Sequence, residues 1–235
     1  MMVSTSLMAA LSWAASWGGG TVETSRLVRW GEDQPGCTFS ADDDGKYRYG
    51  LWTNDFGIVL AVDSQELQKA SRRLEPIFAL QLTLHYRGQE SLAVTTADIS
   101  LEFTQHYRDV HKSLDPDNLS AKLKHDADAL SERAAEDIRK HPEKQHEQET
   151  SLKARQQDIV EMIEFLKQSS LRPITLDARS PEASGWVLFN AKSKWIANWK
   201  KQEELILRVP INNQVIEFPF ALPPSEGDLI LRRRP

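Results

Sequence analysis

The stretch Phe78-Ala-Leu-Gln-Leu-Thr-Leu-His-Tyr86 carries a large apolar or aromatic side chain at every second position. This period of two is typical of an antiparallel strand that buries one face and exposes the other to water. Two later segments, Gly185-Trp-Val-Leu-Phe189 and Val215-Ile-Glu-Phe-Pro-Phe220, are rich in the β-branched and aromatic residues that strands favour. Both halves of the chain therefore predict antiparallel β-sheet.

Residues 117–170 between these halves follow a helical period instead. Their apolar residues return every three, four or seven positions, as on one face of a helix. Pro142 interrupts the run, because proline lacks the N–H that a helix interior needs, and it can begin a second helix. We expect two antiparallel helices, residues 120–140 and 143–169, with a polar tip. The apolar residues that carry this prediction are Leu119, Leu123, Leu130, Ala134, Ile138, Leu152, Ile159 and Leu166.

These patterns predict a mainly β fold with an α insertion. Residues 26–116 and 171–235 are expected to form one antiparallel β-sandwich, and residues 117–170 a long helical hairpin inserted into it. Asp117 or Asn118 is expected to cap the first helix, since a short side-chain oxygen can accept from the free backbone N–H groups.

The first 25 residues are apolar and glycine-rich, and no Lys or Arg precedes Arg26. Three interpretations remain open: an atypical signal peptide, a disordered or misassigned start, and a docked segment. We expect no transmembrane span, because the apolar run is too short for one. Cys37 is the single cysteine, so no intramolecular disulfide forms, and we expect an incidental or buried thiol.

Composition and motifs argue against several functional classes. The net charge of -5 shows no excess of basic residues, so we expect no nucleic-acid partner. His106 and His111 are five positions apart, as are His141 and His146, and this spacing does not place two ligands on one helical face. With no nucleophile or phosphate motif either, we expect no metal, no cofactor and no enzymatic activity.

The order of segments resembles the small immunoglobulin-like sandwich domains of bacterial extracytoplasmic lipoproteins and envelope proteins. The resemblance rests on the alternating strand at residues 78–86, the turn after it, the Gly185-Trp-Val-Leu-Phe189 strand and a final hairpin over residues 205–220. It covers about half of the chain and depends on pattern alone. It implies an immunoglobulin-like fold, a periplasmic or secreted location with the cytoplasm as the alternative, and a binding or scaffolding role.

We therefore expect a non-enzymatic protein that binds a protein partner or itself through the hairpin or a tryptophan-rich surface. The residues expected to bind are Trp195, Trp199, His141 and His146. One alternative is a ligand carrier or enzyme with a pocket between hairpin and sandwich, lined by His106, Tyr107 and His111. Another is a structural subunit of a larger assembly.

Overall fold

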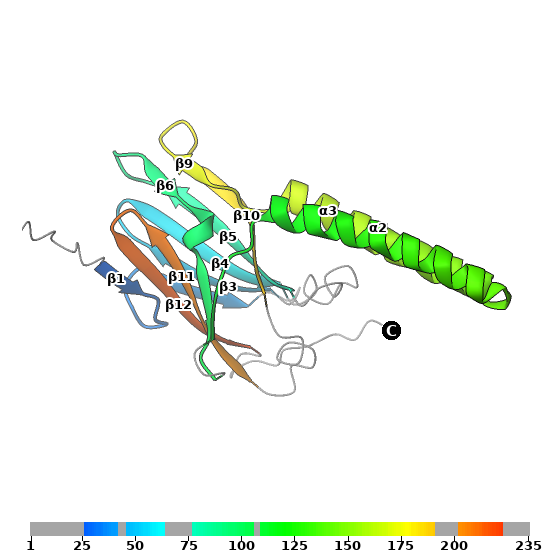
Figure 1. Cartoon of the computed structure of the whole chain (residues 1–235). Coiled ribbons are helices and arrows are strands. Elements are labelled where there is room, and N and C mark those ends of the chain that lie inside the picture. The colour runs from blue at the N-terminus through cyan, green and yellow to red at the C-terminus, as the bar shows by residue number, and fades with distance from the viewer. Residues whose placement is uncertain (1–25, 42–45, 64–76, 106–108, 191–201, 223–235) are drawn as a thin grey trace, which may run out of the picture.

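The computed structural model describes residues 26–41, 46–63, 77–105, 109–190 and 202–222. The described chain is mainly β, with two five-stranded sheets that share one core and a long helical hairpin that extends away from them (Figure 1). The apolar segment predicted at residues 1–25 lies outside the described residues. The mainly β fold with a helical insertion is thus confirmed.

Sheet A has five strands in the order β1-β12-β11-β7-β8. Its strands β12 and β11 form the predicted hairpin, which turns at Asn212 with a φ of 49°. Asparagine tolerates this left-handed conformation, which two-residue hairpin turns require. The bounds are β1 (Arg26–Arg29), β12 (Gln214–Leu222), β11 (Glu203–Ile211), β7 (Ser100–Phe103) and β8 (Asp109–Lys112).

Sheet B also has five strands, in the order β10-β5-β4-β3-β2. The predicted strand at residues 78–86 is β5, and β10 contains the Gly185-Trp-Val-Leu-Phe189 segment. A separate two-stranded sheet pairs β6 (Leu92–Val94) with β9 (Ile174–Leu176). The sheet B bounds are β10 (Glu182–Asn190), β5 (Ile77–Tyr86), β4 (Phe56–Asp63), β3 (Lys46–Trp52) and β2 (Cys37–Ala41).

The pairing differs from the prediction at one place. Strand β1 runs parallel to β12, with Arg26 opposite Gln214, whereas every other strand pair in the described part of the chain is antiparallel. The prediction of purely antiparallel sheets was therefore wrong for this edge. A four-residue strand with arginine at both ends carries no alternation that could have indicated its neighbour.

The apolar faces of the two sheets share one core. On β5, the alternate residues Phe78, Leu80, Leu82 and Leu84 are fully buried there, as the sequence pattern predicts. At about 25 cal/mol per Å² of apolar surface removed from water, this shared core is the main source of stability. Core side chains from sheet A include Leu101, Phe103, Leu207, Val209, Ile216 and Phe218.

The hairpin consists of α2 (Pro116–Lys140) and α3 (Gln145–Ser169), joined by a short 3-10 turn, η3 (Pro142–Lys144). The predicted helices are confirmed, but the predicted cap is wrong. Asp115 caps α2, because its carboxylate accepts from the backbone N–H groups of Asp117 and Asn118 at 2.9 Å. Pro116 takes the first helical position, where its missing N–H costs nothing.

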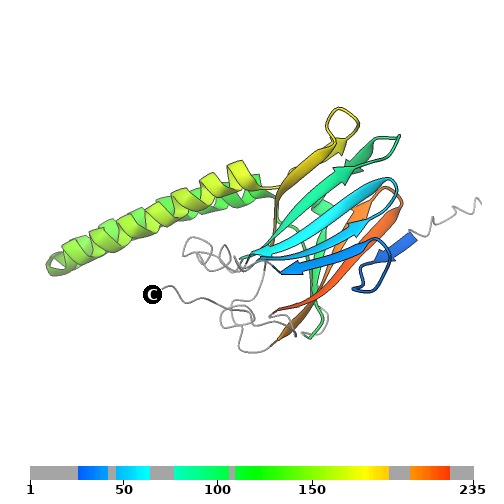
Figure 2. The same ribbon diagram turned by 180° about the vertical axis from the view of Figure 1, so that it is seen from behind.

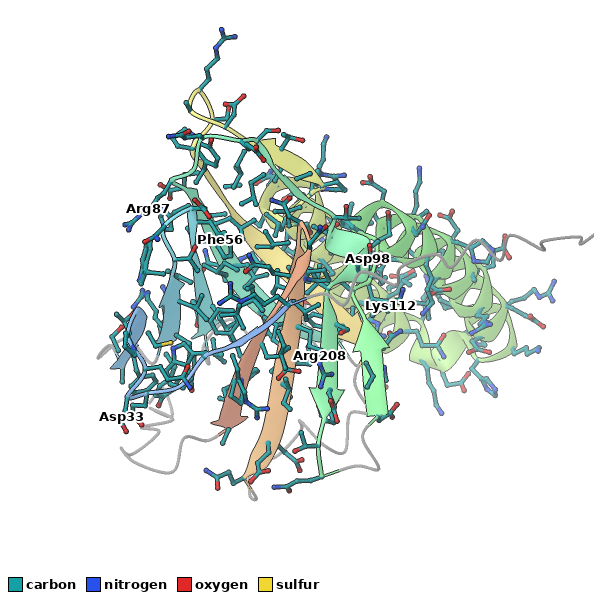
Figure 3. The ribbon with its side chains drawn as sticks, turned by 90° about the vertical axis from the view of Figure 1, so that its left-hand side faces the viewer. Asp33, Phe56, Arg87, Asp98, Lys112 and Arg208 are labelled. Atoms are coloured by element: carbon teal, nitrogen blue, oxygen red, sulfur yellow. The ribbon has the colours of Figure 1, made fainter. Side chains whose placement is uncertain are left out.

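Two buried glutamates and two arginines form an ion-pair network on the outer face of sheet A. Arg208 on β11 donates to Glu102 on β7 at 2.6 Å and to Glu217 on β12 at 2.8 Å, and Arg29 on β1 reaches Glu217 at 3.3 Å. Figure 3 shows Arg208 in the middle of this face. Glu102 and Glu217 are only 7% and 6% exposed, so the two arginines compensate carboxylates that have lost most of their water.

Candidate functional site

The base of the hairpin is anchored on the outer face of sheet B. Ile77 and Ala79 of β5 and Leu188 of β10 point away from the sandwich core and contact the helices. The helical side chains that complete this buried cluster are Leu119, Leu123, Ile159, Met162 and Leu166. Phe165 of α3 also lies against Trp186, with ring centroids 5.7 Å apart. Apolar side chains therefore fill this part of the junction between hairpin and sandwich.

Beyond this base no other described element covers the two helices. We call residues 124–158 the distal arm; it contains no buried residue, and it projects away from the sheets in both views (Figures 1 and 2). A helix advances about 1.5 Å per residue, so each helix of the arm extends for roughly 25 Å. The arm is consequently exposed along its length and free to contact another molecule.

Half-buried small, polar and aliphatic side chains form the seam between the helices of the distal arm. Gln156 of α3 donates to the Ser131 hydroxyl of α2 at 3.0 Å, and Ala127 and Leu130 are half-buried beside this bond. A seam of this kind lets two helices approach closely but removes little apolar surface from water. The arm therefore depends on its base for stability and leaves most of its surface unused by the fold.

The outer surface of the distal arm carries charges of both signs, nine acidic and seven basic residues within 124–158. Their exposed pairs include Lys140 with Glu136, whose Nζ and Oε1 atoms are 2.7 Å apart. Pairs of this type contribute little to stability, since water screens them. A mixed pattern can instead select a partner, because complementary charges favour one docking register over others.

The predicted binding residues His141 and His146 lie together at the tip of the arm, both exposed. His141 ends α2, donating its backbone N–H to the Asp137 carbonyl, and its Nδ1 lies 3.4 Å from Glu143 Oε1. His146 stands in the first turn of α3. The structure thus brings these two histidines to one end of the molecule. Trp195 and Trp199 lie outside the described residues.

Of the two histidines near the start of the hairpin, the structure describes only His111. His106 and Tyr107 lie outside the described residues. His111 on β8 is packed edge-on against Phe103, with centroids 5.7 Å apart, and its Nε2 lies 3.4 Å from Asp109 Oδ2. Across the described ranges, no group of three His, Cys, Asp or Glu side chains is placed to hold a metal ion.

A second candidate site is a pocket of about 510 Å³ at one end of the sandwich. Three separate loops line it, after β3, after β5 and at the β11–β12 turn; Figure 3 shows Phe56 and Arg87 at this end. The Arg87 backbone N–H donates to the Asp55 carbonyl at 2.7 Å, and its guanidinium lies 4.5 Å from the Trp52 ring centre. The polar lining residues are Asn54, Asp55, Arg87, Gln89, Glu90, Asn212 and Gln214.

Sequence reasoning missed this pocket. Its residues come from positions 54–56, 86–92 and 211–214, and they meet only because β4, β5 and β12 end or begin at the same edge of the molecule. Loop residues carry no hydrophobic period. The one signal present was the adjacent pair Asn212 and Asn213 within the hairpin predicted over residues 205–220, and it gave no reason to expect a lining role.

The shifted pKa values in the described chain belong to structural groups. Burial raises the pKa of the Tyr47 and Tyr49 phenols, which lie in the sandwich core. The Arg172 guanidinium donates to Asp117 and lowers the pKa of that carboxyl, at the exposed point where the hairpin joins the sheets. None of these groups lines the pocket or the tip of the arm.

The chain matches no protein-family model, and no curated protein and no solved structure shows significant similarity to it. Among the residues that the structure describes, no helix is both long and apolar enough to cross a membrane.

Proposed function

We propose that this protein is a non-enzymatic binding or scaffolding protein that contacts a protein partner through the distal arm. The observation that carries the proposal is the contrast along the hairpin: its base is buried on sheet B, while residues 124–158 project with no buried side chain. Ordering a long exposed arm costs conformational entropy that its own seam recovers poorly. Contact with a partner supplies the missing burial.

The arrangement of strands supports an immunoglobulin-like classification of the sandwich. In such folds one sheet has the order G-F-C, and the other has strand B between A and E. Here β12-β11-β7-β8 corresponds to G-F-C-C′, and β4-β5-β10 corresponds to A-B-E. The hairpin then occupies the place in the chain between C′ and E where strand D stands. A periplasmic or secreted location stays a prediction from the resemblance.

Site-specific photocrosslinking tests the proposed contact. A photoreactive amino acid at His146 places the probe at the tip of the arm, and one at Arg179 in the exposed β9–β10 loop serves as the control. We expect a discrete crosslinked product from position 146 in the native host extract and none of that mass from position 179. Equal amounts of the same product from both positions would contradict the proposal, because the partner would then contact the arm no more often than an ordinary exposed loop.

A second candidate function is binding of a small polar ligand in the loop-end pocket. The observation that favours it is the convergence of two asparagines, two glutamines and three charged residues around a cavity of about 510 Å³. A thermal-shift screen with neutral saccharides and amino acids tests it, using Arg87→Ala as the site variant and Arg179→Ala as the control. If a ligand raises the melting temperature of both variants equally, it binds outside the loop-end pocket.

A further inference from the structure

Strand β2 leaves an edge of sheet B open. In the described chain the two large sheets have four edge strands, and three are protected. At β10, Leu114 donates its N–H to the Leu188 carbonyl, and Leu171 donates to the Trp186 carbonyl. Strand β1 carries Arg26 and Arg29. Strand β8 carries Asp109 and Lys112. Charges and covering segments of this kind prevent one sheet from pairing with another.

Among the described residues, strand β2 has none of these protections. Its sequence Cys37-Thr-Phe-Ser-Ala41 contains no charge and no proline, and four of its five residues are exposed. One of them, Phe39, contacts Tyr49 of the core with centroids 5.1 Å apart, yet it is still 38% exposed. An aromatic ring on the core side of a sheet edge, left partly in water, is a favourable place for a second surface to cover.

The register of β2 against β3 shows which backbone groups are free to pair. The Trp52 N–H donates to the Gly36 carbonyl at 2.8 Å, so Thr38 with Gly50 and Ser40 with Arg48 are the next bonded pairs. The N–H and C=O groups of Cys37, Phe39 and Ala41 therefore point away from β3. The Cys37 N–H is already used by the Gln34 carbonyl.

We propose that two copies of this chain pair through β2, antiparallel and centred on Phe39. The outward groups at positions 37, 39 and 41 are symmetric about this centre, so Phe39 meets its counterpart and Ala41 meets Cys37 of the second copy. The two Phe39 N–H and C=O groups then satisfy each other, as do Ala41 N–H and Cys37 C=O in both directions. No like charges lie within the paired strands, which is why a second copy fits this edge.

The side chains fit the same pairing. In an antiparallel pair centred on Phe39, Thr38 lies opposite Ser40 of the second copy on the outer face. This protein already joins two strands in that way, since the Thr83 and Ser184 hydroxyls of β5 and β10 are 3.0 Å apart. On the core side the two Phe39 rings become a cross-strand aromatic pair, which contributes about 0.2–1 kcal/mol beyond an alanine pair.

Pairing through β2 would place two hairpins on one face of a continuous ten-stranded sheet. The two-fold axis of an antiparallel strand pair stands perpendicular to the sheet, so equivalent faces stay on the same side. Each hairpin is anchored at the β5–β10 side, remote from β2 in the strand order. Two arms on one face would bind a repeated partner with increased avidity. The dimer itself does not depend on the proposed role of the arm.

A five-residue strand pair buries less than the roughly 1,000 Å² of a stable interface, so we expect a weak dimer that forms as concentration rises. Sedimentation equilibrium of the full chain measures it. Phe39→Lys places like charges at the centre, and Ala41→Pro removes an outward N–H without affecting the bonds to β3. We expect each to raise the dimer dissociation constant at least tenfold. Val110→Lys, on the charged edge strand β8, is the matched control and should leave this dissociation constant unchanged.

A disulfide trap makes the test independent of affinity. In a Cys37→Ser background, Phe39→Cys places two cysteines at a bonded pair, where Cα atoms are about 5.5 Å apart and a disulfide can form. We expect oxidation to give a covalent dimer from this variant and not from Val110→Cys in the same background. A monomer at every concentration, a dimer unaffected by Phe39→Lys and Ala41→Pro, or equal trapping at position 110 would overturn the proposal. The photocrosslinking at His146 tests the arm separately, so its result does not depend on whether the β2 dimer forms.

Discussion

At the base of the hairpin Leu123, Met162 and Leu166 are at most 2% exposed and contact sheet B, whereas every residue of the distal arm is half-buried or exposed. The same two helices pass through both regions. The base has a third layer, the outer face of β5 and β10, whereas no described element covers the arm. The hairpin is therefore part of the buried core at its base alone, and packing against the described sheets does not constrain the sequence of the arm.

Truncation of a base residue should give the largest effect. Leu166→Ala removes a fully buried side chain from the cluster under the helices, and we expect the free energy of unfolding to fall by about 2–5 kcal/mol. Leu152→Ala makes the same chemical change in the seam of the arm, where we expect less than about 1 kcal/mol. Urea denaturation of the two variants measures the contrast. An equal loss of unfolding free energy in both variants would mean that Leu152 is packed as closely in the arm as Leu166 is in the base.

Ionic pairs should show the same contrast between body and arm. Arg208→Met removes the partner that Glu102 and Glu217 share and leaves Glu217 paired with Arg29, and we expect a loss of about 3 kcal/mol. Lys140→Met breaks the exposed pair with Glu136 in the arm, and we expect a change within about 0.5 kcal/mol. Denaturation at neutral pH measures both. A stable Arg208→Met variant would show that water reaches the two carboxylates more freely than their burial indicates.

The cap of α2 should have a smaller effect. Asp115→Ala removes the acceptor for two backbone N–H groups at the base, and we expect a loss of about 1 kcal/mol. Asp128→Ala, in the middle of α2 on the exposed arm, is the control and should change stability by less than about 0.5 kcal/mol. The thermal midpoints of the two variants give the comparison. A larger change for Asp128→Ala would assign an unexpected structural role to the arm.

The sequence predicts elements better than it predicts their neighbours. The period of two at residues 78–86 and the seven-residue spacing of Leu152, Ile159 and Leu166 each identify one element and its apolar face, and both predictions are confirmed. Neither period says what covers that face. Ile77 and Ala79, on the opposite side of β5, contact the hairpin and not water, because strand β5 is buried on both faces at its start.

The two candidate sites, the tip of the arm and the loop-end pocket, also differ in how far the sequence predicts them. His141 and His146 lie close in sequence, so the tip of the arm follows from the helix boundaries alone. The pocket needs loops at residues 54–56, 86–92 and 211–214, the last of which lies more than a hundred residues from the other two. The parallel pairing of β1 with β12 likewise joins the two ends of the described chain. Such contacts depend on the whole topology, which local patterns do not contain.

The smallest effect concerns the ion pair that joins the two ends of the hairpin. Arg172, just after α3, donates to both Asp117 oxygens at 2.7 and 2.9 Å, and this lowers the pKa of the Asp117 carboxyl. Since the folded pKa lies below the unfolded one, the stabilisation is present above the unfolded pKa and is lost as pH falls through the folded pKa. Both groups are exposed, so the effect on stability is small.

We expect Arg172→Gln to raise the pKa of Asp117 toward its ordinary value in an NMR titration, with Arg179→Gln leaving it unchanged. An unchanged pKa in Arg172→Gln would mean that this pair does not persist in solution, and that the buried cluster alone fixes the base from which the arm projects.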